Sequence, residues 1–426
     1  MNFKLVGFKN KSKVNKIWLD DFFPHNTEYF YSFPVGEDSS FFTKATIWKE
    51  ELIAMRPMVC SRGDLKVVTF AASLNPTSWN LMSYLYGADL NRNLVVLPKN
   101  IDTTVRGPRR NTLVANALAK TATVGGLVMA QPYIYKSRNS IYQMPPDLSI
   151  WLNDKKNMAD YVPARYLPKR FYQFASGVEF MAADIQTIPC VVKVSSSCSG
   201  DGVAICHSSN DVERAKRKFK WIRGNIIIEE YINSIHNIGI QFGIPYHKNH
   251  PIEIIGYNQQ LVGKNNEYLG GKIDYHDKVP GIGAAYKILL AQILPEIRRR
   301  GWYGVGGFDV LLDAAGGIYF IDANLRMTAA TPYIFMVRNQ VIKQPLLSFT
   351  GSFVGSVADF KAKILSLAKS DSDDALLKII AIVEHDGVFY FNAAACFDNH
   401  RGLLAVVKKL LSLGVKSRVL KLVSHL

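Results

Sequence analysis

The sequence predicts a mixed α/β protein of several domains. Apolar, strand-like runs occur at residues 64–70, 93–97 and 125–130, and residues 111–120 have the apolar spacing of a helix. Continuous apolar runs of this kind are typical of parallel strands that are buried on both faces. A chain of 426 residues is long enough for two to four domains with a large core. No G-x-G-x-x-G motif follows these strands, so the pattern does not indicate a dinucleotide-binding domain.

The composition is that of a soluble globular protein, with 48% hydrophobic and 20% charged residues. The sequence has no amino-terminal signal pattern and no apolar run near the roughly 20 residues that span a bilayer. Its cysteines are odd in number and form no C-x-x-C pair, which indicates reduced thiols rather than a disulfide frame or zinc site. We therefore expect a cytoplasmic protein with no membrane partner. The cysteines are Cys60, Cys190, Cys198, Cys206 and Cys396.

The net charge of +16 is the unusual bulk property. It is compatible with a nucleic acid, an anionic membrane or a polyphosphate ligand as partner. It is equally compatible with a lysine-rich enzyme that uses part of its charge on a nucleotide. The chain lacks the alternating aromatic and basic residues of RNA-binding surfaces, which favours the enzyme and predicts no nucleic-acid partner.

A second unit begins near Trp151. Residues 191–194 and 203–206 read as the two strands of a hairpin, and its tip at residues 195–202 consists mostly of small residues. The next helix is expected to be capped by Asn210 and to end at Gly224. Beyond it the sequence predicts a strand at 226–228, a helix at 285–300 kinked at Pro295, and strands at 307–312, 318–322, 379–383 and 388–392, then a helix at 402–413.

The strongest chemical signal is a hairpin that carries Asp309, Asp322 and Asn324. The two aspartates lie on adjacent antiparallel strands, and Asn324 is two residues beyond Asp322, on the same face. Three converging oxygen ligands suit Mg²⁺, which completes its shell with water and phosphate oxygens. The alternative is a pair of strand-end acids that bond only to backbone amides. The apolar neighbours of both aspartates favour burial, and hence a metal site.

A second signal is Lys193, which precedes the small-residue loop at 195–202. A strand lysine beside such a loop suits phosphate binding, because backbone N–H groups of the loop can close over the phosphate oxygens. The alternative is an ordinary turn at a hairpin tip.

These motifs resemble those of ATP-grasp ligases in order and spacing. The motifs are Lys193, the loop at 195–202, Ile-Ile-Glu-Glu-Tyr-Ile at 227–232, Gly-Phe-Asp at 307–309 and Ile-Asp-Ala-Asn-Leu-Arg at 321–326. The similarity covers about residues 151–330, and the flanks resemble those of L-amino acid ligases and of peptide ligases of the pheganomycin type. It implies an α/β (α+β) ATP-grasp fold with a pre-ATP-grasp domain at 1–150, a lid subdomain at 151–235, a large subdomain at 236–330 and an α+β domain at 331–426.

The resemblance also implies a role for each matching residue, with ATP and Mg²⁺ as cofactors. Lys155 (or Lys156) and Lys193 would contact phosphates together with Ser199, Gly200 and Gly202 of the loop. Glu229 would accept from the adenine amino group, the backbone of Glu230 and Ile232 would read the rest of its edge, and His236 or Asn237 occupies the ribose position in place of the usual acid. Asp309, Asp322 and Asn324 would bind metal, and Arg326 would hold phosphate or a substrate carboxylate. The candidate substrate residues are Asn258, Gln259, Gly270, Gly271, Arg326 and Thr328, although a solvated strand end is an alternative for Asn258 and Gln259.

Two positions depart from the family's pattern. Asp322 replaces the usual glutamate, and Leu325 stands where proline is common. No metal ligand is lost, so the resemblance implies an active carboxylate–amine ligase that works through an acylphosphate on amino acids or peptides. Lys193 and Arg326 would assist catalysis by neutralising charge, and the loop would exclude water. A ligase that modifies a protein or a natural-product intermediate and an ATP-binding module without turnover are the alternatives, and a homodimer is left open.

Overall fold

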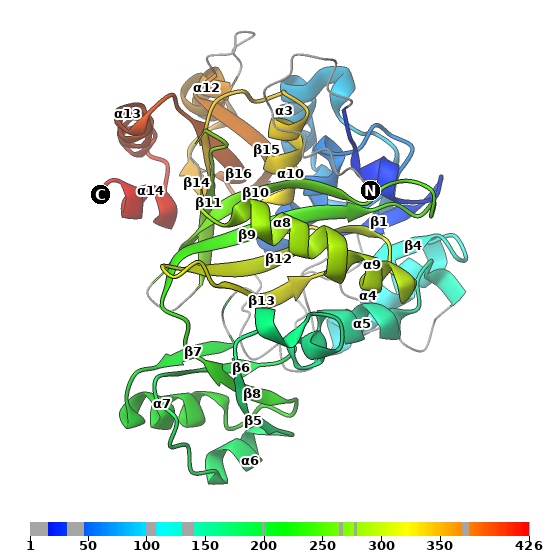
Figure 1. Cartoon of the computed structure of the whole chain (residues 1–426). Helices are drawn as coiled ribbons and strands as arrows, with labels where there is room; N and C mark the ends of the chain where they lie inside the picture. The colour runs from blue at the N-terminus through cyan, green and yellow to red at the C-terminus, as the bar shows by residue number, and fades with distance from the viewer. Residues whose placement is uncertain are drawn as a thin grey trace.

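The computed structural model describes residues 16–31, 47–98, 108–129, 140–197, 200, 202–263, 267–276, 279–368 and 375–425. These residues form three sheets (Figure 1): a long antiparallel sheet in the centre, a small parallel sheet beside it, and a third sheet in a separate lobe. In this described part, no helix combines the length and the hydropathy that crossing a membrane requires.

The amino-terminal sheet is parallel throughout and has the order β3-β2-β1-β4. The strands expected at 64–70, 93–97 and 125–130 are present as β2, β3 and β4, and the predicted helix is α4. The sequence did not predict β1, which lies between β2 and β4 but has only three residues. The bounds in this region are η1 Leu19–Phe22, β1 Glu28–Phe30, α2 Ile47–Met55, η2 Arg56–Val59, β2 Lys66–Phe70, η3 Ala72–Leu74, α3 Pro76–Tyr86, η4 Gly87–Asp89, β3 Leu94–Leu97, α4 Pro108–Thr121 and β4 Leu127–Met129.

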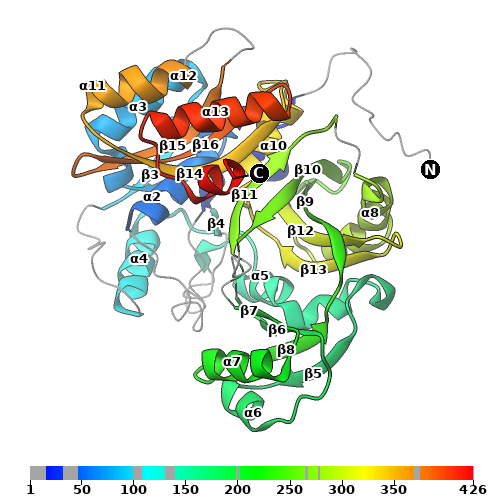
Figure 2. The ribbon, with the colours of Figure 1, turned by 90° about the vertical axis from the view of Figure 1, so that its left-hand side faces the viewer.

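The separate lobe contains the antiparallel sheet β5-β8-β6-β7 with helices α6 and α7, and it extends away from the rest of the molecule (Figure 2). It has its own hydrophobic core, in which Phe180, Phe219 and Ile228 are fully buried. The bounds from the start of this region are α5 Pro146–Asn153, η6 Lys155–Asp160, η7 Ala164–Tyr166, β5 Arg170–Phe174, α6 Gly177–Ala182, β6 Cys190–Val194, β7 Val203–Cys206, α7 Ser209–Phe219 and β8 Ile226–Glu230.

The expected cap of α7 was wrong. Ser208, not Asn210, is the N-cap: its backbone is extended and its side chain accepts a hydrogen bond from the backbone N–H of Asp211. Asp211 completes the start of the helix by accepting from the N–H of His207 at 3.1 Å. Asn210 therefore lies inside the first turn, and the helix ends at Phe219, before Gly224.

The central sheet is antiparallel, with the order β13-β12-β9-β10-β11-β14-β16-β15. β11 pairs with β14, so strands from before and after residue 330 belong to one sheet. The predicted strands at 307–312, 318–322, 379–383 and 388–392 correspond to β12, β13, β15 and β16. The bounds are β9 Ser234–Ile244, β10 Glu253–Val262, β11 Tyr268–Ile273, β12 Gly304–Asp313, β13 Ile318–Asn324, β14 Leu346–Val354, β15 Leu377–His385 and β16 Val388–Cys396.

The helix expected at 285–300 is interrupted where the sequence predicted a kink. A π-helical turn, η8, precedes Pro295, which is in the first turn of the segment that follows. Proline causes this because it has no N–H and its ring displaces the carbonyl four residues earlier. The bounds here and in the tail are α8 Ile282–Ile288, η8 Leu289–Ile293, α9 Leu294–Arg299, α10 Thr331–Arg338, α11 Val357–Phe360, η9 Lys361–Leu365, α12 Ser366–Ala368, α13 His400–Ser412 and α14 Arg418–Val423.

Two helices connect the ends of the chain to the central sheet. α2 packs against β15 and β16 as well as against β2, and α14 packs against β11 and β14. Residues from near both ends of the chain thereby contact neighbouring strands of the central sheet.

Candidate active site

A cavity of about 960 Å³ lies between the separate lobe and the central sheet. One end is bordered by β6, β7 and the segment that follows β8, and by β12 and β13 on the opposite side. The other end extends to α2, β14, β16 and α14. We call these the nucleotide end and the far end, and the two differ in the residues that line them.

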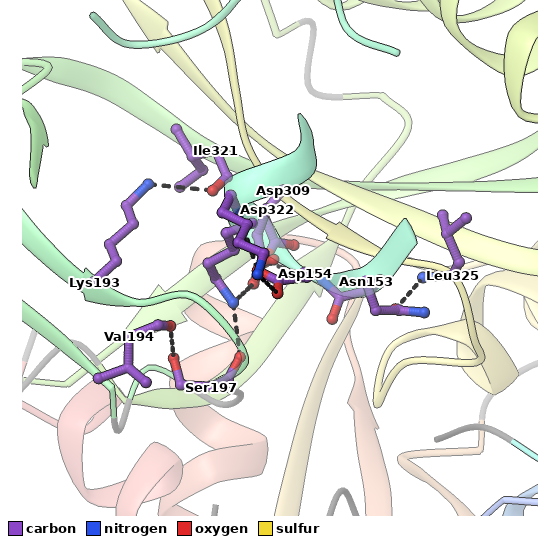
Figure 3. Close-up of polar contacts among 12 residues, drawn as sticks. Asn153, Asp154, Lys193, Val194, Ser197, Asp309, Ile321, Asp322 and Leu325 are labelled. Carbon is purple, nitrogen blue, oxygen red and sulfur yellow. Dashed lines mark hydrogen bonds and ion pairs between the residues drawn. The ribbon is translucent and has the colours of Figure 1, made fainter. Parts of the chain in front are cut away.

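The predicted metal ligands meet on the β12–β13 hairpin. Asp309 pairs directly with Asp322 across the two strands, and the amide nitrogen of Asn324 lies 3.3 Å from an oxygen of Asp309. The strand pairing skips Ile321, which leaves a bulge there, and the Ile321 carbonyl accepts a hydrogen bond from Lys193 Nζ at 3.2 Å. Figure 3 shows Lys193 reaching this carbonyl beside the two aspartates. The hairpin thus joins the predicted metal ligands to the lysine that is predicted to bind phosphate.

The electrostatics of the aspartate pair fit a divalent cation. Burial, and next the charge of Asp322, raise the pKa of Asp309 to about 7. Two neighbouring carboxylates repel one another in this setting, and a bound cation removes the repulsion. Gln260 Nε2 also donates to Asp309 Oδ1 at 2.6 Å. Rotation of the Asn324 amide would bring its oxygen to the metal, so the donor set suits Mg²⁺.

Leu325 has a structural role that proline could not fill. Its backbone N–H donates to Asn153 Oδ1 at 2.8 Å, which ties the end of β13 to α5. Proline lacks this N–H. The departure from the family's pattern at this position is therefore matched by a hydrogen bond that holds the end of β13 against the end of α5 (Figure 3).

Lys155 rather than Lys156 faces the cavity. The side chain of Lys155 is buried, and its Nζ lies 3.1 Å from Asp322 Oδ2 and 2.7 Å from the carbonyl oxygen of Ser197. Lys156 is more exposed, pairs with Asp154 at 3.6 Å and does not border the cavity. Lys155 thus links the metal ligands to the small-residue loop, between which the phosphates of a nucleotide would lie.

Glu229 is placed differently from the expectation. It does not border the cavity; Lys193 lies 2.8 Å from one of its oxygens and Arg170 lies 3.1 Å from the other. Burial acts to raise the pKa of Glu229, but Lys193 and Arg170 together hold it below its ordinary value. The carboxylate therefore holds two cations, and the geometry does not place it against an adenine amino group.

The segment after β8 forms part of the nucleotide end. Glu230, Tyr231 and Ile232 border the cavity, as does Asn237 but not His236. The Asn237 Oδ1 atom is buried and has no hydrogen-bond partner among the described residues. Apolar walls suited to a purine ring come from Val191, Val203, Ile205, Leu311 and Ile321.

The small-residue loop is described in part. Gly200 borders the cavity with φ +79°, a backbone angle that favours glycine. The Gly202 carbonyl accepts from the N–H of Val194 at 2.8 Å and closes the hairpin. Ser199 lies outside the described residues.

The substrate residues expected on β10 and β11 need one correction. Asn258 and Gln260 border the cavity, whereas Gln259 does not, because successive residues of a strand point to opposite faces. Gly270 and Gly271 do not border it either; a Cβ at Gly270 would lie 2.2 Å from the Ser348 carbonyl, and one at Gly271 would lie 2.4 Å from Asn258 Nδ2. The two glycines therefore allow close packing instead of contacting a substrate.

Arg326 and Thr328 both border the cavity. The Nε atom of Arg326 is buried without a partner in the described residues, and so are both polar atoms of the Asn258 side chain. Buried polar groups of this kind normally bond to something, so these atoms fit polar groups of a ligand. Thr328 donates to Gln241 at 3.2 Å.

The sequence did not single out Gln241, Gln260, Arg56 or Asn392, although all four border the cavity. The signal that could have found Asn392 and the two glutamines is a polar residue inside an otherwise apolar strand. Arg56 directly follows the apolar end of a helix, where a buried cation has no obvious structural purpose.

Comparisons with known proteins bear on the fold of the chain and on one segment of it. Residues 168–324 match the family model described as "L-aspartate--L-methionine ligase, ATP grasp". The fold is similar to that of an L-amino acid ligase from Bacillus licheniformis, with TM-score 0.51, 12% identity, and coverage of 92% of this chain and 98% of that chain. It is also similar to N5-carboxyaminoimidazole synthetase from Staphylococcus aureus complexed with ADP, with TM-score 0.54, 9% identity, and coverage of 92% and 99%. A third similar structure is the biotin carboxylase domain of the Hydrogenobacter thermophilus 2-oxoglutarate carboxylase, with TM-score 0.53, 14% identity, and coverage of 92% and 91%.

The three-sheet architecture and these similarities define the fold as ATP-grasp. Residues 168–324 are similar to the ATP-grasp segment of a ligase family, and the fold of the chain is that of ATP-grasp enzymes. The resemblance stated from the sequence is therefore confirmed at this level.

Proposed function

We propose that the protein joins the carboxylate of one amino acid to the amine of a second amino acid or short peptide, through an acylphosphate. The observation that carries this proposal is the partly buried pair of Asp309 and Asp322 beside the buried Lys155, in a cavity that continues well beyond the nucleotide end. A volume of about 960 Å³ leaves room for substrates beside a nucleotide. The family model names L-aspartate and L-methionine, which makes these the first pair to test.

In this proposal ATP lies in the nucleotide end, with its base between the apolar walls and along the segment 230–232. Asp309, Asp322 and Asn324 hold magnesium, which offsets the charge of the phosphate oxygens. Lys155 and Lys193 contact the phosphates from opposite sides, and Lys193 is already held close by Glu229 and by the Ile321 carbonyl.

The substrate carboxylate is oriented by Arg326, whose buried Nε lacks a partner in the described residues. A carboxylate oxygen attacks the γ-phosphorus and ADP leaves. The amine then attacks the acyl carbon, phosphate leaves, and the nitrogen loses its proton. Holding the groups in line and neutralising their charge accounts for most of the catalysis, because no covalent enzyme intermediate is required.

The test is ADP release with mass detection of the product. The parent protein with ATP, Mg²⁺, L-aspartate and L-methionine should release ADP only when both amino acids are present, and should form their dipeptide. Asp322→Ala should abolish this release because a metal ligand is lost. If the parent binds ATP but forms ADP with no amino acid or peptide mixture, the protein is a binding module and the proposal fails. A product only on a protein or larger intermediate would replace the acceptor class.

A further inference from the structure

The far end of the cavity is strongly basic. Among the described residues that border it, the basic ones are Lys49, Arg56, Lys416, Arg418 and Lys421, and the acidic one is Glu267. Glu267 forms an ion pair with Arg418. Four of the basic residues are exposed, and only Arg56 is buried, with 9% of its surface accessible. Arg56 is therefore the least hydrated of the cations that an anion bound at this end could contact.

Arg56 is surrounded by neutral groups. Its Nε donates to Asn392 Oδ1 at 2.9 Å, and its guanidinium lies over the Tyr31 ring at 5.7 Å. Asn392 is fixed in turn by donating to Thr350 Oγ1 at 2.9 Å. No acid in the described part of the chain forms an ion pair with Arg56. Burying a guanidinium without a carboxylate is unfavourable, so such a site indicates that a ligand supplies the negative charge.

Arg56 and the predicted metal ligand Asp309 border the same cavity and both act on Tyr268. Burial is the main cause that raises the pKa of Tyr268 to about 12, and the charges of Arg56 and Asp309 act on that hydroxyl in opposite directions. Tyr268 is thus within electrostatic range of both groups, and all three border one cavity. A small molecule could reach from the metal ligands to Arg56.

The walls near Arg56 are apolar and aromatic. Trp48 and Tyr390 stack with ring centroids 4.2 Å apart and an angle of 5° between their planes. Leu52 and Ile53 of α2 border the same end. A ligand here would combine a carboxylate with an apolar body, and this is the chemistry of an amino acid rather than of a sugar or a phosphate.

We propose that Arg56, oriented by Asn392, binds a substrate carboxylate that is not phosphorylated during the reaction. This inference rests on the proposed ligase function and adds to it the charge of the substrates. The carboxylate has two possible sources: the second carboxylate of a dicarboxylic acyl donor, or the free carboxylate of the amine substrate. A fork-shaped guanidinium suits either because it can donate two parallel hydrogen bonds to a carboxylate.

The experiment removes the charge from the protein and from the substrate in turn. ADP release is first measured with L-aspartate and L-methionine. L-asparagine or L-isoasparagine then replaces L-aspartate, and in a separate series L-methioninamide replaces L-methionine. The variants are Arg56→Met, Arg56→Lys and, as the control, Lys49→Met, which removes the same charge from an exposed position at the same end.

With the parent, one of these amides should have a kcat/KM about 10- to 100-fold lower than that of the acid it replaces. With Arg56→Met the same amide and acid should differ by less than about threefold, since the variant has already lost the contact. Which amide does so identifies the source of the carboxylate. Arg56→Met should act mainly on KM, Arg56→Lys should restore part of the loss, and Lys49→Met should change kcat/KM by about threefold or less. The inference would be overturned if Arg56→Met lowered kcat/KM, relative to the parent, equally for acids and amides, or did not lower it at all. Either result would leave the ligase function intact.

A binding measurement covers the case in which these pairs give no turnover. L-aspartate and L-methionine are titrated calorimetrically into the parent and Arg56→Met in the presence of Mg²⁺ and ADP. Binding to the parent that is weakened at least tenfold in Arg56→Met supports the assignment, and equal or absent binding overturns it. Unchanged ADP affinity and thermal unfolding in Arg56→Met show that the variant is folded.

Discussion

Lys193 and Glu229 form a buried ion pair on neighbouring strands, with Nζ 2.8 Å from Oε2. Both residues belong to the separate lobe, and Lys193 also donates to the Ile321 carbonyl of the central sheet. The two contacts therefore hold the Lys193 ammonium in place at the junction of two parts of the molecule, and the proposed function has this cation bind phosphate. Under the proposed function, Glu229 would act on the nucleotide through Lys193 instead of touching it.

The first prediction follows from this relationship. Lys193→Met should lower kcat/KM for ATP about 100-fold, and Glu229→Gln should lower it about tenfold, because an unheld lysine must be ordered on binding. The double variant should lower kcat/KM for ATP no further than Lys193→Met alone, since the two residues act as one unit. Steady-state ADP release measures all three. A double variant that loses substantially more than Lys193→Met would indicate that Glu229 contacts the base directly.

Two adjacent lysines provide a matched comparison. Lys155→Met should reduce kcat about 100-fold because its ammonium lies between Asp322 and the loop, where phosphate charge must be neutralised. Lys156→Met removes the same charge one residue away, outside the cavity, and should reduce kcat by about threefold or less. The assay is ADP release at saturating substrates. Comparable losses in the two variants would reassign the phosphate contact.

Asp309 should reduce stability in the absence of metal. Its pKa of about 7 is above the ordinary value, so its contribution to stability is present at low pH and is lost as the pH rises through about 7. At pH 8 and without metal, Asp309→Asn should therefore raise Tm by about 2–5 °C, although it removes activity. The gain should shrink as the pH falls below 7 and disappear near pH 4, close to the ordinary pKa of 3.8, where the carboxyl of the unfolded chain is protonated as well.

Magnesium should reverse the order of thermal stability of the parent and Asp309→Asn. With ADP and Mg²⁺, the parent should gain more in Tm than Asp309→Asn, because ligand binding stabilises the state that binds it. Thermal unfolding followed by circular dichroism measures both effects. A variant that is less stable than the parent at pH 8 without metal would contradict the assignment of Asp309 as a strained metal ligand.

A second matched comparison tests the face of β10. Gln260→Ala should lower kcat about tenfold, because Gln260 borders the cavity and donates to Asp309 at 2.6 Å. Gln259→Ala, on the opposite face, should change kcat by about threefold or less. ADP release again provides the measurement. If Gln259→Ala proves to be the more damaging change, the strand register at the cavity is wrong.

The nucleotide end was largely predictable from the sequence because its signals are local. Asp309, Asp322 and Asn324 are close together on one hairpin, and Lys193 precedes a distinctive loop. β1 was not predictable because three residues carry too little periodicity, and the choice between Ser208 and Asn210 as cap depended on a backbone conformation that the sequence does not show. The positions of the domain boundaries remain predictions.

The far end was not predictable because it depends on contacts between distant parts of the chain. Arg56 meets Asn392 across 336 positions, and neither residue belongs to a motif. To predict which face of β10 borders the cavity, one needs the register of β10 against β9 and β11, and period-two alternation alone does not set this register. The contacts of Glu229 were not predicted for a related reason, because Arg170, which pairs with it, lies on another strand.

The cavity wall changes its origin along its length. Its nucleotide end comes largely from residues 155–322, and its far end comes largely from residues before 60 and from 350 onward, which α2 and α14 bring to the central sheet. If the proposed functions hold, energy supply and substrate choice are encoded largely in separate stretches of the sequence. Under the functions proposed above, exchanging the two outer stretches between related proteins would transfer the choice of amino acid and leave the use of ATP unaltered.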